Sequence, residues 1–139
     1  VDSTGGFGNG LVDYTKANMG TQGLNFSGKA DEECMFNVRT QMYMDLGKAI
    51  KERAFYLPDI GDSMRCRNQL SYTTYILNGR GQCQLVPKEE IKKVTGSSPD
   101  HADALVLANR ARKIASGEVR QGTVDARAVA SRMLAASRR

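Results

Sequence analysis

The stretch Ser97–Ala108 reads SSPDHADALVLA, and its pattern decides how the last part of the domain folds. Ser98 suits an N-cap position, Pro99 suits the first helical turn, and Asp100 lies near the positive end of the helix dipole. An apolar stripe follows, formed by Leu105, Leu107 and Ala108. The stretch therefore predicts a helix that packs one face against a core.

Asp103 lies inside this helix, three residues after Asp100 and four before Leu107. That spacing places it on the face that the apolar residues bury. A carboxylate there needs a partner, because a desolvated, unpaired charge is costly. We expect Asp103 either to be solvated at the rim of the helix packing or to face other carboxylates and a bound cation.

A glycine-rich turn near the start of the chain is the second informative feature, and Val1 and Asp2 before it read as the end of a strand. The turn leads into a helix to about Met19. Its glycines, Gly6 and Gly8 among them, let the backbone approach a phosphate at the helix N-terminus. The spacing matches neither the GxGxxG nor the Lys-Ser/Thr nucleotide motif. Asp2, just before this turn, either occupies the catalytic edge of an α/β sheet or is a turn acid that caps the loop.

The middle of the chain predicts a brief strand, two helices and a β-hairpin, over residues 24–26, 31–53, 62–70 and 72–86 in turn. The methionines of the long helix fit core positions better than a binding surface. A polar helical stretch follows the hairpin and carries Lys88, Lys92 and Lys93. Such lysines normally form a solvated face, and they bind nucleic acid where a polyanion lies alongside.

Composition and charge set the bounds on class. The 139 residues are 40% hydrophobic, which suits one soluble domain, and no apolar run approaches the ~20 residues that span a bilayer. Three widely spaced cysteines and a single histidine argue against a zinc site and favour a reducing compartment. The chain opens without a Met or a secretion leader, so we expect a fragment that is not secreted.

The formal net charge of +5 is uneven along the chain. Residues 117–139 hold five Arg against Glu118 and Asp125, which is a net +3 and leaves +2 for the rest. We therefore expect a nearly balanced globular part at 1–116 and a basic C-terminal tail at 117–139. The tail is either frayed or in contact with DNA phosphates or an acidic partner.

Four segments together carry a family resemblance: VDSTGGFGNGLVD, the long amphipathic helix, YTTYILNGRGQCQLVPKEEIKKVTG and SSPDHADALVLA. In this order they resemble the C-terminal nuclease domain of the large terminase subunit of tailed bacteriophages, over most of residues 1–116. The resemblance implies an α/β fold, an RNase H-like mixed sheet flanked by helices, here partial because the first strands and the ATPase domain are absent. It also implies an endonuclease that cuts concatemeric double-stranded viral DNA in the host cytoplasm, with a portal protein and a small terminase subunit as partners.

The resemblance also assigns site residues. Asp2 and Asp103 match the family's catalytic acids, which hold Mg²⁺ or Mn²⁺, and Asp100 is a further candidate metal ligand. Clustered carboxylates suit two hard cations that activate water and stabilise the leaving oxygen of a phosphodiester. The glycine loop and the three lysines are the candidate DNA contacts. Another family Asp would precede residue 1, so we expect this chain alone to bind metal weakly and to cut DNA poorly or not at all.

Two alternative functions remain open. One is a different RNase H-like nuclease, such as a junction resolvase or a transposase core, which would share the acids but not this run of motifs. The other is a non-catalytic module whose glycine loop and tail bind a polyanion while the acids only cap helices. His101 fits an exposed first-turn side chain better than a general base.

Overall fold

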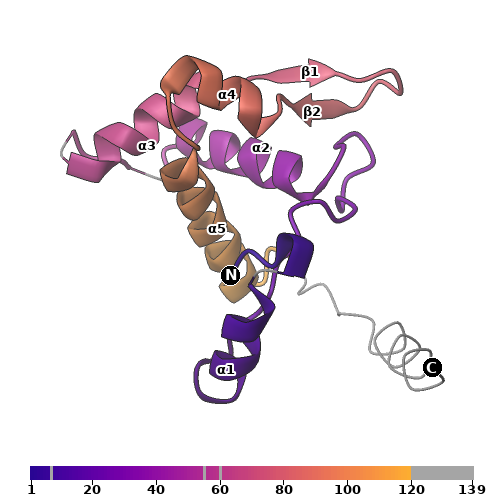
Figure 1. The fold of residues 1–139 in the computed structure, drawn as a ribbon, viewed down its shortest axis with the longest axis vertical. Helices are drawn as coiled ribbons and strands as arrows, with labels where there is room; N and C mark the ends of the chain where they lie inside the picture. The colour runs from indigo at the N-terminus through magenta and orange to yellow at the C-terminus, as the bar shows by residue number, and fades with distance from the viewer. Residues whose placement is uncertain (7, 55, 60, 120–139) are drawn as a thin grey trace.

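The computed structural model describes residues 1–6, 8–54, 56–59 and 61–119 of the chain. Over these residues it is a mixed α/β structure with five α-helices and a two-stranded antiparallel sheet. The bounds are η1 Thr4–Gly6, α1 Asn9–Met19, α2 Val38–Lys51, α3 Gly61–Tyr72, β1 Tyr75–Leu77, β2 Cys83–Leu85, α4 Lys88–Thr95 and α5 Asp100–Ala115. Helices α2, α3 and α5 form the centre, with α1 and the β-hairpin at opposite ends (Figure 1).

The core lies where α2 packs against α5, with α3 and β2 closing its sides. The buried apolar residues that form it are Phe26, Met42, Tyr43, Leu46, Leu85, Ala102 and Val106. On α5 the fully buried apolar residues are Ala102 and Val106, whereas Leu107 is partly buried and Ala108 is exposed. The predicted stripe is therefore rotated, and the face that α5 buries is centred on smaller residues that let α2 approach closely.

The first turn of α5 is not capped by Ser98, so that prediction is wrong. The side chain of Gln69, from α3, caps this turn instead. Its Oε1 accepts a hydrogen bond from the Ala102 backbone N–H at 3.0 Å, and its Nε2 donates to the Ser98 carbonyl at 3.2 Å. A buried side chain from a neighbouring helix therefore satisfies a terminal N–H that a local cap would otherwise have to satisfy.

Helix α2 begins seven residues later than the predicted helix over 31–53, at Val38. Asn37 is its N-cap, and its side chain accepts a hydrogen bond from the Thr40 N–H at 2.9 Å. Before the cap the chain forms turns and bends rather than a helix, and Met35 forms a parallel bridge with Cys83. Pairing with a distant strand thus overrides the local helical pattern. Met42 is 1% exposed, which confirms that this methionine fills the core.

The β-hairpin is confirmed, with Tyr75 opposite Leu85 and Leu77 opposite Cys83. Gly81 closes its turn in the left-handed region, at φ 74°, and donates its N–H to the carbonyl of Asn78 at 2.9 Å. Elsewhere the described chain contains two isolated parallel bridges, Asp2 with Leu24 and Met35 with Cys83, so the predicted strand over 24–26 reduces to a single bridge.

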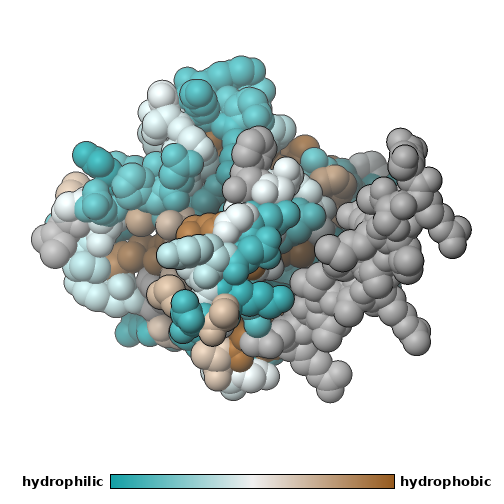
Figure 2. Space-filling model, turned by 60° about the horizontal axis from the view of Figure 1, so that its bottom comes forward, coloured by the Kyte–Doolittle hydropathy of each residue, from teal (hydrophilic) through white to brown (hydrophobic). Residues whose placement is uncertain are grey.

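Among the coloured residues in Figure 2, hydrophilic ones predominate, and apolar residues lie in smaller patches between them. Within the described ranges no helix is long and apolar enough to cross a membrane. The basic tail predicted at 117–139 lies outside the described residues from position 120 onward.

Candidate functional site

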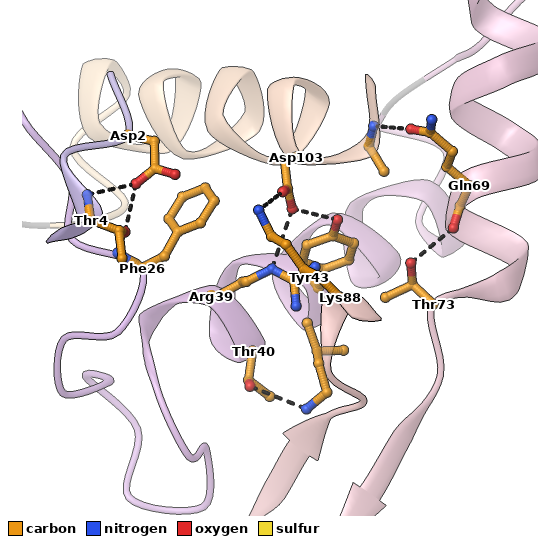
Figure 3. Close-up of polar contacts among 12 residues, drawn as sticks. Asp2, Thr4, Phe26, Arg39, Thr40, Tyr43, Gln69, Thr73, Lys88 and Asp103 are labelled. Carbon is orange, nitrogen blue, oxygen red and sulfur yellow. Dashed lines mark hydrogen bonds and ion pairs between the residues drawn. The ribbon is translucent and has the colours of Figure 1, made fainter. Parts of the chain in front are cut away.

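Asp103 lies in a buried polar cluster at the interface of α5, α2 and the start of α4 (Figure 3). Its side chain is 9% exposed. Its Oδ1 accepts a hydrogen bond from the Tyr43 hydroxyl at 2.7 Å and one from Arg39 Nε at 3.3 Å, while Lys88 Nζ lies 2.5 Å from Oδ2. These four residues are called the Asp103 cluster below. Neither expected surrounding is found in the described residues, because the partners are two cationic side chains and a phenol.

The sequence positions these partners through two helices. Arg39 and Tyr43 are four residues apart on α2, so they share the face that packs on α5. The Arg39 guanidinium also lies over the Tyr43 ring, with Cζ 4.9 Å from the centroid. Lys88 is the first residue of α4 and reaches the cluster from the end of the hairpin. Asp103 therefore joins three elements that are far apart in the sequence.

The cluster carries one negative charge and two positive charges. Arg39 is 9% exposed, and its Nη2 is buried with no hydrogen-bond partner among the described residues. The pKa of the Tyr43 hydroxyl is raised far above its ordinary value, first because the group is buried and second because the Asp103 carboxylate repels a phenolate. Tyr43 is therefore a neutral donor to a charged acceptor.

Asp2 is held locally at the end of its parallel bridge with Leu24. Its Oδ1 accepts hydrogen bonds from the Thr4 N–H at 2.9 Å and the Thr4 hydroxyl at 2.6 Å. These contacts match the loop-capping alternative for this carboxylate. The Thr4 hydroxyl oxygen also accepts from the Phe26 N–H at 2.9 Å, so the turn is fixed to the core.

Phe26 connects the two predicted catalytic acids. On one side its backbone N–H bonds Thr4, the residue that holds Asp2. On the other side its ring lies 5.8 Å from the ammonium of Lys88, which bonds Asp103. Figure 3 shows the ring between the two carboxylates. The fold thus brings Asp2 and Asp103 into one region, although they come from opposite ends of the described chain.

Asp100 does not join them. It is exposed and lines a groove of about 570 Å³ together with Arg65 and Tyr72 of α3. His101 lines the same groove, with Nε2 3.8 Å from Asp62 Oδ1 and a half-exposed side chain, as expected for a first-turn residue. Among the residues described here, no group of three or more His, Cys, Asp or Glu side chains is arranged around one point.

The two glycines named as phosphate contacts have different structural roles. Gly6 has φ 87°, a left-handed conformation that favours glycine. Gly8 has ordinary helical angles, but a Cβ on it would collide with the Asp2 carbonyl. Gly8 is therefore explained by close packing of the turn against the backbone of Asp2.

The three candidate DNA-binding lysines also differ. Lys88 points inward to Asp103, with 38% of its side chain exposed. Lys93 is exposed and pairs with Glu90 at 2.8 Å, and Lys92 is exposed in the last turn of α4. Phosphate binding by these lysines stays a prediction, and only Lys92 and Lys93 lie on an outer surface.

Arg39 and Tyr43 were not identified from the sequence. Met42, Leu46 and Ala49 form the buried apolar stripe of this helix, whereas Ile50 is 40% exposed. An Arg and a Tyr four residues apart beside that stripe are the signal that could have indicated a buried acidic partner.

Comparisons with known protein families, with curated proteins and with solved structures gave no match to this chain.

Proposed function

We propose that the chain is a metal-dependent endonuclease domain of the kind found in the large terminase subunit of tailed bacteriophages, acting on concatemeric double-stranded DNA. The observation that carries the proposal is the placement of Asp2 and Asp103 on either side of Phe26 (Figure 3). These are the two acids to which the resemblance assigns catalysis. A carboxylate metal site requires acids from separate elements, and here one comes from the isolated bridge with Leu24 and the other from α5.

Under this proposal Asp2 and Asp103 hold Mg²⁺ or Mn²⁺, with Asp100 as a more distant candidate ligand. Carboxylate oxygens are the ligands that these hard cations prefer, so the donor atoms fit the metal in kind. The bound pair of cations would activate water and stabilise the leaving oxygen of the cut phosphodiester.

The chain's own residues orient both acids. Two hydrogen bonds from Thr4 fix the Asp2 carboxylate, and the Asp103 carboxylate is fixed by Tyr43 and Arg39. Supporting contacts of this kind keep ligands in place before anything binds. The exposed Lys92 and Lys93 would contact DNA phosphates.

The finer fold and the partners belong to the same proposal. The two parallel bridges, at Asp2 and at Met35, support an RNase H-like mixed sheet, which combines both strand directions. A portal protein and a small terminase subunit as partners, and action in the host cytoplasm, follow from the resemblance alone.

One alternative is favoured by a specific observation. The ion pairs of Asp103 with Arg39 and Lys88 are what a purely structural acid in a non-catalytic module would make. A resolvase or transposase core would share the acids and differ in preferring branched or end-specific DNA. The experiment below separates these functions.

Thermal melts of the chain with and without millimolar Mg²⁺ or Mn²⁺ test the proposal. Wild type is compared with Asp2→Asn and Asp103→Asn, and with Asp13→Asn as the matched control on the exposed helix α1. A ligand that binds only the folded state raises the melting midpoint. We expect a metal-dependent rise in wild type and Asp13→Asn that is absent from the other two variants.

Cleavage of linear and branched duplex DNA in Mn²⁺ gives the second readout. Cutting of linear duplex that disappears in both Asp variants supports the terminase assignment, and strong preference for branched DNA favours the resolvase alternative. A rise in midpoint that persists in Asp103→Asn, or no rise in wild type, contradicts the metal site and favours the non-catalytic module.

A further inference from the structure

The β-hairpin has one covered edge, formed by β2. There the Cys83 N–H donates to the Cys34 carbonyl at 2.8 Å, and the Cys83 carbonyl accepts from the Phe36 N–H at 2.9 Å. The Leu85 N–H donates to the Thr40 hydroxyl at 3.4 Å. The segment over residues 34–36 and helix α2 therefore bond the backbone groups that β2 turns away from β1.

The outer edge of β1 has no such cover in the described part of the chain. The Thr74 carbonyl accepts from the Val86 N–H at 3.0 Å, so the backbone of Thr74 faces the returning chain. Backbone groups alternate in direction along an antiparallel ladder, so those of Tyr75 and Leu77 point outward. Among the described residues these outward N–H and C=O groups have no hydrogen-bond partner. Figure 1 shows β1 as the outer strand of the hairpin, on the far side of β2 from α2.

The side chains of β1 are apolar and exposed. Tyr75, Ile76 and Leu77 are 58%, 52% and 68% exposed. Tyr75 lies opposite the core residue Leu85, so Tyr75 and Leu77 continue the core-facing side of the sheet past its edge. Proteins usually protect a free edge with charges or proline, and the stretch TTYILN over residues 73–78 contains neither. Such an edge is a template for another strand.

The symmetry of this edge suits β1 of a second copy. Tyr75 and Leu77 flank Ile76, so an antiparallel pair centred on Ile76 places Tyr75 of each copy opposite Leu77 of the other. Each of these pairs exchanges both N–H···O bonds, which satisfies the outward backbone groups of both copies. Ile76 meets Ile76 of the second copy on the opposite face, where side chains approach closely. Aromatic and β-branched residues make favourable cross-strand pairs, and no like charges meet because the stretch is neutral.

We propose that the chain forms a two-fold symmetric dimer through antiparallel pairing of β1 with β1 of a second copy. Both hairpins then belong to one continuous sheet, and the covered edge of each β2 ends it, so assembly stops at two copies. Because β1 has only 3 residues, the dimer is weak and forms at high protein concentration. This inference goes beyond the proposed function and needs no metal site.

Sedimentation equilibrium of the full chain over a range of protein concentrations tests the dimer. We expect the wild-type mass to rise with concentration from one chain mass toward two, and no further. Ile76→Lys and Ile76→Glu each place like charges across the axis, so each variant alone should stay at one chain mass. An equimolar mixture of the two places opposite charges there and should regain the wild-type mass. Leu11→Lys is the matched control at an exposed leucine of α1, and it should associate as wild type does.

Leu77→Pro tests the backbone bonds and leaves Ile76 unchanged. Proline removes the outward N–H of this residue and no bond to β2, so the hairpin keeps its ladder. Each dimer loses two hydrogen bonds, and association should weaken about tenfold. Circular dichroism checks that each variant is folded, and where a charge variant is not, the result for Leu77→Pro decides.

Four results overturn the inference. They are a wild type that stays at one chain mass, a mass that grows beyond two copies, association that persists in both charge variants or is unchanged in Leu77→Pro, and charge variants that fail to associate when mixed. The last result would assign the edge to a strand of a different protein. None of these results bears on metal binding, so the proposed function stands or fails separately.

Discussion

Tyr43→Phe removes one hydroxyl from the Asp103 cluster and leaves the aromatic ring in the core. The hydroxyl is a buried donor 2.7 Å from a carboxylate oxygen. Hydrogen bonds to charged groups contribute about 1.5–3 kcal/mol to stability. Arg39 still bonds the same carboxylate oxygen in the variant. We therefore expect the free energy of unfolding to fall by about 2 kcal/mol near neutral pH.

The size of this loss should depend on pH, because burial and the neighbouring Asp103 raise the pKa of Tyr43 far above its ordinary value of 10.0. A group with a raised folded pKa gives stability that is complete below its unfolded pKa and lost as pH rises toward the folded one. From about pH 8 to about pH 11 the unfolded phenol ionises and the folded one does not, which costs wild type about 1.4 kcal/mol.

The phenylalanine variant has no phenol to ionise and lacks this loss. The gap, meaning the difference in the free energy of unfolding between the two proteins, should therefore narrow from about 2 to below about 1 kcal/mol. Urea unfolding across this pH range measures the gap, and equal slopes against urea show that both denatured states are comparable. Tyr14→Phe is the control, since Tyr14 is 83% exposed, and its gap to wild type should stay near zero. A gap for Tyr43→Phe that stays constant to about pH 11 would refute the assignment of Tyr43 as a neutral buried donor.

Substitutions at four further positions are compared with wild type by urea unfolding. Leu46→Ala, at a position 1% exposed, should cost about 2–5 kcal/mol, whereas Leu77→Ala, at 68% exposed, should stay within about 0.5 kcal/mol. Gln69→Leu should cost about 1–3 kcal/mol and speed hydrogen exchange at the Ala102 amide, because it removes the partner of that N–H. Asn37→Ala should cost about 1 kcal/mol through loss of the α2 cap, and Asn37→Asp should recover most of it.

The elements that the sequence predicted well are those set by local chemistry. The hairpin follows from the Asn78-Gly79 turn between two short β-prone runs, and α1 ends at Gly20 in a left-handed conformation. The predicted start of α2 was wrong because Met35 pairs with Cys83, and no local sequence pattern indicates contact with so distant a residue. The predicted cap by Ser98 was wrong for the same reason, because the side chain that bonds the Ala102 N–H is Gln69 of another helix.

In the candidate site, too, local features were predictable from the sequence and contacts with distant residues were not. The sequence located Asp103 on the packing face of a helix and required a partner for it, and both points hold. It could not supply the partners, because Arg39 and Tyr43 are 64 and 60 positions away and become neighbours only when α2 packs on α5. For Asp2 the partner is Thr4, two residues away, and the capping alternative was accordingly within reach of sequence reasoning.

Desolvation limits the net contribution of the Asp103 cluster to stability. Burying an acid with two cations costs desolvation that apolar side chains of similar volume would avoid, so such clusters are often no more stable than a hydrophobic replacement. The cluster is also graded in exposure, from Arg39 at 11% to Lys88 at 38% of the side chain. Lys88 is therefore the more exposed of the two cationic partners, and its ammonium lies on the side of Asp103 that faces Phe26 (Figure 3). Substitution of Lys88 should therefore disturb the buried part of the cluster less than substitution of Arg39.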